Sequence, residues 1–129
     1  MSLLSGVRVL DLSTVIAAPF AAGLMADFGA DVIKVEQPDG GDPFRKLGPY
    51  HKGEPMRWAA MGRNKRCITL DLRKEKGKEL CLALIAKCDV VIENFRTGTL
   101  QKWGLDYETM KKANPKVIIT RVTGYGQTG

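Results

Sequence analysis

The sequence is poor in metal-binding and membrane-spanning features, and each shortage excludes a class of protein. Three cysteines without a CxxC pair and a single His51 supply neither a zinc site nor a disulfide framework. No apolar run approaches the ~20 residues of a membrane span, and the start lacks the basic and apolar regions of a signal peptide. We therefore expect reduced thiols, no metal, no membrane association and a cytoplasmic location.

Glycine is also missing from the turn after the first expected strand. The run Asp11–Ala18 reads DLSTVIAA, without the GxGxxG pattern that lets a backbone approach a pyrophosphate. Glu36, at the end of the second expected strand, is the type of acid that binds a ribose, but alone it is a weak signal. The sequence therefore disfavours an NAD-dependent enzyme.

What is present is an ordinary globular composition with a basic balance. The 129 residues are 44% hydrophobic and 26% charged, and 20 Lys and Arg against 14 Asp and Glu give a net charge of +6. Such a chain suits one domain. The sequence lacks the aromatic-rich strand pair or recognition helix of a nucleic-acid binder. A small polyanionic ligand therefore explains the charge better than nucleic acid does.

Strand and helix patterns alternate along the chain. Short β-branched and apolar runs predict strands at 7–12, 31–36, 67–72, 89–92 and 117–122. Helix patterns lie between them, at 19–28, 75–87 and 106–113, with a short irregular or helical piece at 97–103. This alternation predicts an α/β fold with a Rossmann-like, mostly parallel, doubly wound sheet and flanking helices.

Two helical patterns carry specific expectations. Phe20, Leu24 and Phe28 recur every four residues and predict one apolar stripe on the first helix. Cys81 and Cys88 are seven residues apart and predict one buried face of a later helix.

The segment 38–66 differs from the rest of the chain. It contains four prolines, several glycines and little periodicity, with 56–61 as a possible helical turn. We predict a long irregular loop here, and loops of this length are usually functional or disordered.

In a parallel sheet of this kind, ligands bind at the carboxyl ends of the strands. Those ends are expected at 13–16, 36–37, 72–73, 93–96 and 123–125. An aromatic such as Phe95 suits a flat base, and cations such as Arg96 suit phosphates. The alternative is that Phe95 packs on a neighbouring helix and Arg96 is only solvated.

No catalytic pair stands out among the residues at these ends. The carboxylates there are equally well explained as strand-end or capping residues: Asp11, Glu36, Asp71 and Glu93.

Four sequence motifs in order resemble those of one family. They are 5–13 with 28–36 (SGVRVLDLS and FGADVIKVE), 64–66 (NKR), 89–98 (DVVIENFRTG) and 124–129 (GYGQTG). Together they cover essentially the whole chain and resemble family III CoA-transferases of the CaiB/BaiF type. That family includes formyl-CoA transferase, the carnitine CoA-transferases and α-methylacyl-CoA racemase.

The resemblance implies coenzyme A as the ligand, with no metal. By position it implies these CoA-binding residues: Val15, Ile16, Leu70, Leu72, Arg73, Asn94, Phe95, Arg96 and Lys102. The chain departs from the family pattern at three positions. Lys102 and Gln37 stand where members often have arginine, and Thr97 stands where proline is usual. Lys102 keeps the charge but not the bidentate fork of arginine.

The resemblance further implies that residues 1–129 are the N-terminal part of a large CoA-binding domain. The family moves CoA between a carboxylic acid and an acyl-CoA through an aspartyl intermediate, or racemises 2-methylacyl-CoA. It places the nucleophilic aspartate downstream of Gly129, so we expect no catalytic residue in this chain.

Association is a further implication. We expect an interlocked homodimer, or a partner chain with the remaining sequence, and incomplete cover of the Phe20 helix and of strand 117–122. A non-catalytic nucleotide- or CoA-binding module is the alternative.

Overall fold

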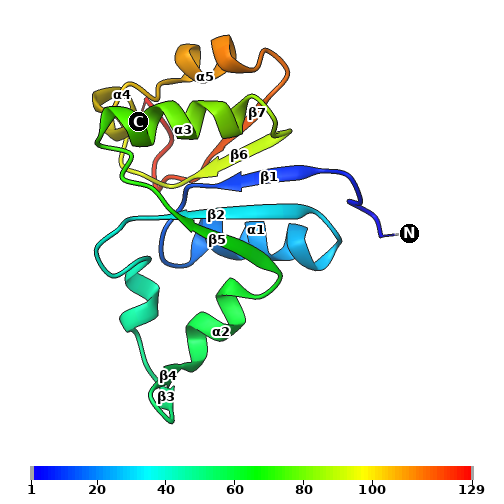
Figure 1. The fold of residues 1–129 in the computed structure, drawn as a ribbon, viewed down its shortest axis with the longest axis vertical. Coiled ribbons are helices and arrows are strands. Elements are labelled where there is room, and N and C mark those ends of the chain that lie inside the picture. The colour runs from blue at the N-terminus through cyan, green and yellow to red at the C-terminus, as the bar shows by residue number, and fades with distance from the viewer. Residues whose placement is uncertain (1, 129) are drawn as a thin grey trace.

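The computed structural model describes residues 2–128, in which five strands form one parallel sheet (Figure 1). They are β1 (Arg8–Asp11), β2 (Asp31–Glu36), β5 (Lys65–Thr69), β6 (Val90–Glu93) and β7 (Ile118–Arg121). The order is β5-β2-β1-β6-β7, and every neighbouring pair is parallel. Strand order therefore reverses between β1 and β6, which confirms the predicted doubly wound α/β fold.

The third predicted strand is shifted in the structure. It was expected at 67–72, but β5 covers Lys65–Thr69, in register with β2 from Val32–Lys65 to Glu36–Thr69. Leu70 and Leu72 therefore lie beyond the strand, where their side chains reach the edge of the sheet rather than its middle.

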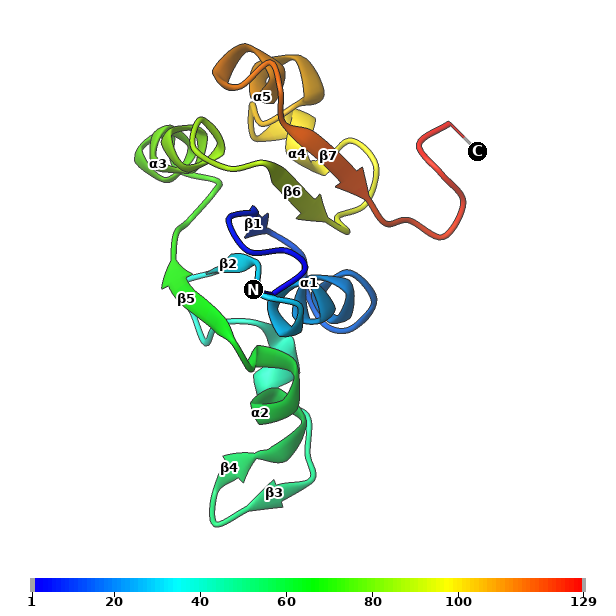
Figure 2. The same cartoon turned by 90° about the vertical axis from the view of Figure 1, so that its right-hand side faces the viewer.

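Helices cover both faces of the sheet (Figure 2). The helices on these faces are α1 (Ala17–Asp27), α3 (Glu75–Ile85), α4 (Thr99–Lys102) and α5 (Tyr107–Ala113), while α2 (Met56–Gly62) lies against α1. Asp106 caps α5, because its side chain accepts a hydrogen bond from the Thr109 N–H at 2.9 Å. Within residues 2–128 no helix is long and apolar enough to cross a membrane.

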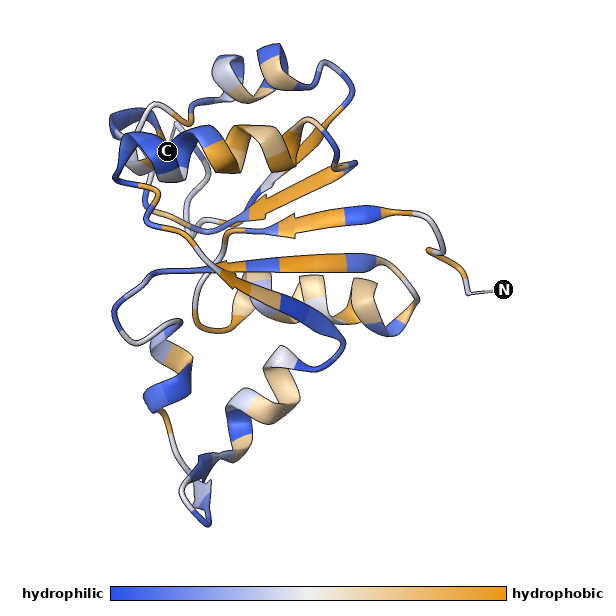
Figure 3. Ribbon diagram, in the orientation of Figure 1, coloured by the Kyte–Doolittle hydropathy of each residue, from blue (hydrophilic) through white to orange (hydrophobic). Residues whose placement is uncertain are grey.

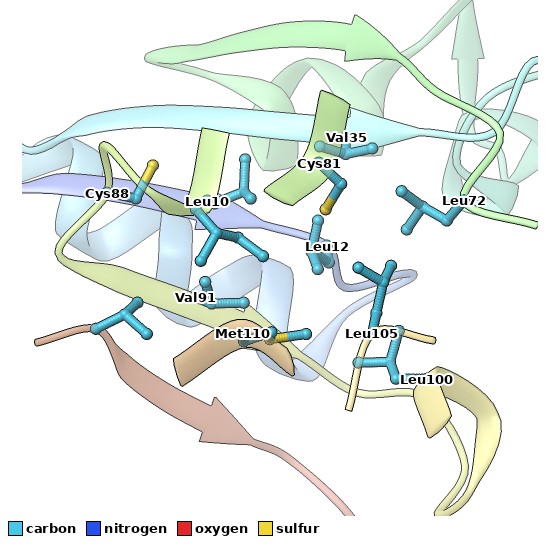
Figure 4. Close-up of a cluster of buried hydrophobic side chains, with 12 residues drawn as sticks. Leu10, Leu12, Val35, Leu72, Cys81, Cys88, Val91, Leu100, Leu105 and Met110 are labelled. Carbon is cyan, nitrogen blue, oxygen red and sulfur yellow. The ribbon is translucent and has the colours of Figure 1, made fainter. Parts of the chain in front are cut away.

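The face covered by α3 and α5 holds the larger core, built from bulky side chains (Figure 4). Its buried members are Leu10, Leu12, Val35, Leu72, Cys81, Ile85, Cys88, Val91, Leu100, Leu105, Met110 and Val117. The central strands are accordingly among the most hydrophobic parts of the ribbon (Figure 3). Burial of this size is the main source of stability in such a domain.

The face covered by α1 is built from small residues. Ala18, Ala22 and Ala26 of the helix pack on Val9 and Val32 of the sheet. This brings the helix backbone close to the sheet.

The predicted stripe of α1 does not form this buried face. Phe20, Leu24 and Phe28 are 48%, 41% and 52% exposed, so the larger apolar side chains point away from the sheet. The exposed stripe agrees with the expectation that this chain alone covers it incompletely, as does Ile118 on β7, which is 63% exposed.

Residues 38–66 are more regular than predicted. They contain a 3-10 helix, η1 (Pro43–Lys46), a small hairpin of β3 (Tyr50–His51) and β4 (Glu54–Pro55), and then α2 and the start of β5. The hairpin projects from the sheet at the far end of the molecule (Figures 1 and 2). The helical turn predicted at 56–61 corresponds to α2. The 3-10 helix η1 and the hairpin are too short to leave a hydrophobic period, so the pattern did not reveal them.

The three cysteines are free, and Cys67 on β5 is exposed. Cys81 and Cys88 are both buried, but α3 ends at Ile85, so Cys88 lies in the turn after the helix rather than on its face. Burial raises the pKa of the Cys81 thiol to about 12, which makes it an inert core residue.

Candidate functional site

The switch point between β1 and β6 is closed by a side-chain clamp. The Asn94 Oδ1 accepts a hydrogen bond from the Thr14 N–H, and its Nδ2 donates one to the Thr14 carbonyl, both at 2.8 Å. Asn94 was predicted to contact the ligand. The structure shows its amide committed to the backbone of the neighbouring turn, so it shapes the site.

The turn that follows β1 has an unusual backbone. Val15 has a φ of 67°, in the left-handed region, where a β-branched residue is strained by about 1–3 kcal/mol. Its N–H donates to the Asp42 carboxylate, at 3.1 Å and 3.3 Å. Ile16 then begins α1 with its side chain half exposed. In dinucleotide-binding proteins, glycines allow the tight turn at this position. Here a side chain distant in sequence, Asp42, holds the turn instead.

A first cavity of about 180 Å³ lies beside this turn, at the carboxyl ends of β1, β2 and β5. Its lining is Leu12, Thr14, Val35, Glu36, Gln37, Gly41, Asp42, Pro43, Leu70, Asp71, Leu72, Arg73, Phe95 and Trp103. Four predicted site residues meet here: Leu70, Leu72, Arg73 and Phe95. The mixture of leucines, aromatics and a few polar groups is typical of a pocket for a heterocyclic ring.

Arg73 is the cation at the rim of the first cavity. Its guanidinium pairs with Asp71, with Nε–Oδ1 at 2.7 Å and Nη2–Oδ2 at 3.1 Å, and this hydrogen bonding lowers the pKa of the Asp71 carboxyl. An ion pair this exposed adds little stability, because solvent screens the attraction between its charges. A phosphate can therefore compete for Arg73 at little cost.

A second, larger cavity of about 500 Å³ lies on the other side of the switch point. Its lining is Ala17, Asn94, Phe95, Arg96, Thr97, Val122, Thr123, Gly124, Tyr125 and Gly126. The predicted residues Asn94, Phe95 and Arg96 line it, as does Thr97, where the family pattern has proline.

Phe95 is common to both cavities. Its ring also packs edge-on against Trp103, with centroids 5.2 Å apart and planes at 74°. The packing interpretation of Phe95 is therefore confirmed. Because the residue also lines both cavities, its contact with a ligand stays a prediction.

Val15, Ile16 and Lys102 are the predicted residues that the cavities do not include. Val15 and Ile16 lie in the turn between Thr14 of the first cavity and Ala17 of the second. Lys102 is exposed at the end of α4, next to Trp103, and within residues 2–128 it lines neither cavity.

Sequence reasoning placed Glu36 at a strand end but missed residues 41–46, which pack against it and of which Gly41, Asp42 and Pro43 line the first cavity. Glu36 accepts the Asp42 N–H at 2.8 Å and a bidentate pair from Arg45, at 2.6 Å and 2.7 Å. Burial raises the pKa of Glu36, but Arg45 and the Asp42 N–H outweigh it and hold the pKa below its ordinary value. The guanidinium carbon of Arg45 also lies 3.9 Å from the centroid of the Trp58 ring. The sequence signal for these contacts was Glu36 itself, an acid at the end of an apolar strand that needs partners when buried.

Glu93 ends β6 as Glu36 ends β2. It accepts the Phe95 N–H at 2.8 Å, and the Nε of Arg121 is 3.5 Å away. Burial raises the pKa of Glu93, and the Phe95 N–H and Arg121 only partly offset this. Glu93 therefore orients the segment that carries Phe95. Within residues 2–128 no three metal-binding side chains come together.

Comparison with known proteins decides the family. The model of CoA-transferase family III matches residues 4–129. The chain belongs to that family. The motif assignment made from the sequence is therefore confirmed.

Two relatives of this family III chain are named as transferases. The chain is 54% identical over 127 residues to the beta subunit of succinyl-CoA–L-malate CoA-transferase from Chloroflexus aurantiacus, across 98% of this chain and 31% of that protein. It is 44% identical to formyl-CoA:oxalate CoA-transferase from Afipia carboxidovorans, across 95% and 29%. The chain thus spans about a third of the length of these relatives.

A solved structure confirms the fold of the family III chain. A CaiB/BaiF family protein from Brucella suis superposes with a TM-score of 0.92 at 45% identity, and the match covers 99% of this chain and 35% of that one.

Proposed function

We propose that this chain is the CoA-binding portion of an acyl-CoA transferase. The observation that carries the proposal is the pair of cavities at the switch point, with Phe95 common to both. CoA has a compact heterocyclic end and a long thiol-bearing arm, so it needs one pocket for a ring and a second space for the arm.

The two cavities suit the two ends of CoA. The adenine occupies the first cavity, against Leu70, Leu72 and Phe95, with Arg73 at its rim for a phosphate. The arm passes the Val15 turn into the second cavity, near Asn94 and Arg96. The net charge of +6 favours a ligand with three phosphate groups.

The proposed reaction moves CoA between an acyl-CoA and a free carboxylic acid through an aspartyl intermediate. By the family resemblance, the aspartate belongs to sequence beyond the residues described here. Several relatives are named for succinyl-CoA or succinate, which supports a short dicarboxylic acid as the acyl group.

Calorimetric titration with CoA at low and high ionic strength tests the binding. We expect weaker affinity at high salt, because salt screens the attraction between Arg73 and a phosphate. Arg73→Gln should remove most of that salt dependence and Phe95→Ala should weaken binding at both salts. Lys116→Gln, the same loss of charge before β7 at the opposite edge of the sheet, serves as the control. An absence of binding at both salts would overturn the proposal for this chain.

Thioester exchange tests whether the nucleophilic aspartate belongs to another part of the sequence. With succinyl-CoA and a panel of free acids, the 129-residue chain should show only background exchange. Turnover that disappears when one of its own aspartates is changed would refute that assignment.

Association with another chain is the proposed state of the protein. Two relatives are named as alpha and beta subunits, and Phe20, Leu24, Phe28 and Ile118 are all more than two-fifths exposed here. Sedimentation across a concentration range should show association. A monomer at every concentration would contradict it.

A further inference from the structure

A lysine lies buried in the middle of the sheet, beneath the turn that separates the two cavities. Lys34 is on β2, an interior strand of the sheet, and its side chain is only 1% exposed. Its Nζ donates to the Ser13 carbonyl and lies 3.0 Å from the Asp42 Oδ2 and 3.9 Å from the Asp11 Oδ1. Neither the family assignment nor the proposed CoA contacts give this residue a role.

Lys34 belongs to a closed set of four buried charges. Lys65 Nζ is 3.0 Å from the Asp11 Oδ2 and donates to the Pro19 carbonyl at 2.7 Å. The order Lys65–Asp11–Lys34–Asp42 alternates in sign and sums to zero. Buried ion pairs of this kind usually give no more stability than well-packed apolar side chains of the same size. A purely stabilising purpose would therefore be served as well by leucine and methionine.

The outer contacts of the set converge on one stretch of backbone. Lys34 holds the Ser13 carbonyl, Asp42 holds the Val15 N–H, and Lys65 holds the Pro19 carbonyl. The three bonded groups are the N–H of the left-handed Val15 and one carbonyl on each side of it. The four charges themselves come from β1, β2, β5 and the segment before η1, so the turn is tied to four separate parts of the chain.

We propose that Lys34 and Asp42 are a positioning pair for the ligand site. They hold Ser13–Ile16 in its left-handed conformation, and that turn sets the relative placement of the two cavities. Lys34 touches no ligand in this arrangement and acts through the Ser13 carbonyl and the Asp42 carboxylate. As a role in CoA binding, the inference rests on the proposed function, whereas the control of the turn stands on the contacts alone.

The test compares Lys34→Met, Asp42→Asn and the double variant. The Lys34→Met change leaves a buried, uncompensated carboxylate, which disturbs the bond to the Val15 N–H. We expect Val15 amide exchange to accelerate about tenfold and CoA affinity to fall about tenfold. In the double variant the uncompensated charge is gone, and the side-chain amide oxygen that replaces the carboxylate still accepts from Val15. Both quantities should then return to within about threefold of the parent.

One control variant and two contrary outcomes make the test decisive. Asp31→Asn breaks the exposed pair with Arg66 at the other end of β2 and should change neither quantity. If Lys34→Met lowers only the unfolding temperature, and folded protein keeps the parent's Val15 exchange and CoA affinity, the pair is merely structural and the inference is wrong. An absence of rescue in the double variant contradicts it equally.

The experiment also separates this inference from the proposed function. If the parent chain binds no CoA, the proposed function fails, while Val15 exchange still reports whether the pair holds the turn. If Lys34→Met does not fold, Asp42→Asn alone supplies the test. It should then accelerate Val15 exchange more than exchange at Thr109, whose N–H is held by Asp106 on the far side of the sheet.

Discussion

The two faces of the sheet are built on different principles. The α3 and α5 face is a continuous apolar core of leucine, isoleucine, methionine and cysteine. The α1 face combines alanines with the buried charges Asp11, Lys34 and Lys65. Each face ends in a buried glutamate, but Glu36 on the α1 face is fully paired, whereas Glu93 on the other has one arginine at 3.5 Å.

The difference shows that one face supplies most of the folding free energy, whereas the other fixes the position of the turn and loop at the candidate site. The apolar face buries the apolar surface area that drives folding. Its side chains can be exchanged for others of similar volume at modest cost. The α1 face has less apolar surface, and its polar contacts have fixed directions and lengths. The Val15 turn and the segment 41–46 are positioned from this second face.

The largest effect is expected from removing bulk on the apolar face. Ile85→Ala empties a fully buried site and should cost about 2–5 kcal/mol of unfolding free energy. Leu80→Ala on the same helix, at a side chain that is 42% exposed, is the matched control and should cost much less. Denaturant unfolding measures both, and equal losses would show that α3 is not anchored by its buried face.

A glycine-to-alanine change should lower stability on one face and raise it on the other. A Cβ on Gly77 of α3 would collide with the Asp71 carbonyl oxygen, so Gly77→Ala should destabilise by about 1–3 kcal/mol despite better helix propensity. A Cβ on Gly23 of α1 would meet nothing closer than 3.8 Å, so Gly23→Ala should stabilise by up to about 1 kcal/mol. Thermal unfolding of the two variants decides this. Destabilisation by Gly23→Ala would mean that α1 packs more tightly than its contacts indicate.

Removing the arginine partner of each glutamate should reduce stability by different amounts. Arg45→Met leaves Glu36 without its bidentate partner and should cost about 1–2 kcal/mol, reduced from a fully buried pair because Arg45 is 36% exposed. Arg121→Met should cost less, since its nitrogen is 3.5 Å from Glu93. The ratio of the two losses in denaturant unfolding is the measurement, and a larger loss for Arg121→Met would reverse the comparison.

The smallest effect is a difference in pH dependence. The lowered pKa of Glu36 adds stability above its unfolded value of 4.5, and this is lost as pH falls through the folded pKa. The raised pKa of Glu93 does the opposite, because stability falls as pH rises from 4.5 through its folded pKa. The loss of unfolding free energy caused by Glu36→Gln should therefore shrink towards acid pH, and that caused by Glu93→Gln should shrink as pH rises. Parallel curves between about pH 3 and pH 7 would contradict the assignment.

Much of this architecture could be predicted from the sequence because its signals are local. Runs such as 31–36 and 89–92 carry their β-branched residues in sequence, and Asp106 lies beside the N–H that it caps. The family motifs also led to Leu70, Leu72, Arg73 and Phe95, which line the first cavity.

The rest depends on pairings between distant residues. Lys34 in an apolar strand indicates a buried partner, but nothing in the sequence identifies Asp42 as that partner. The hairpin of 50–55 has strands of two residues, too short for any period. On α1 the alanines pack because they allow close approach, whereas hydrophobic periodicity gives more weight to Phe20 and Leu24.

The Asn94 clamp has a consequence for the order of folding. Thr14 and Asn94 are separated by 80 residues, so the turn after β1 cannot acquire its final shape from its own neighbours in sequence. It must wait until β6 has docked beside β1, a parallel pairing that closes a long loop and is slow for that reason. The Val15 turn is thus among the last parts of the chain to become native. During synthesis, the nascent chain can therefore complete the proposed CoA site only after β6 is in place.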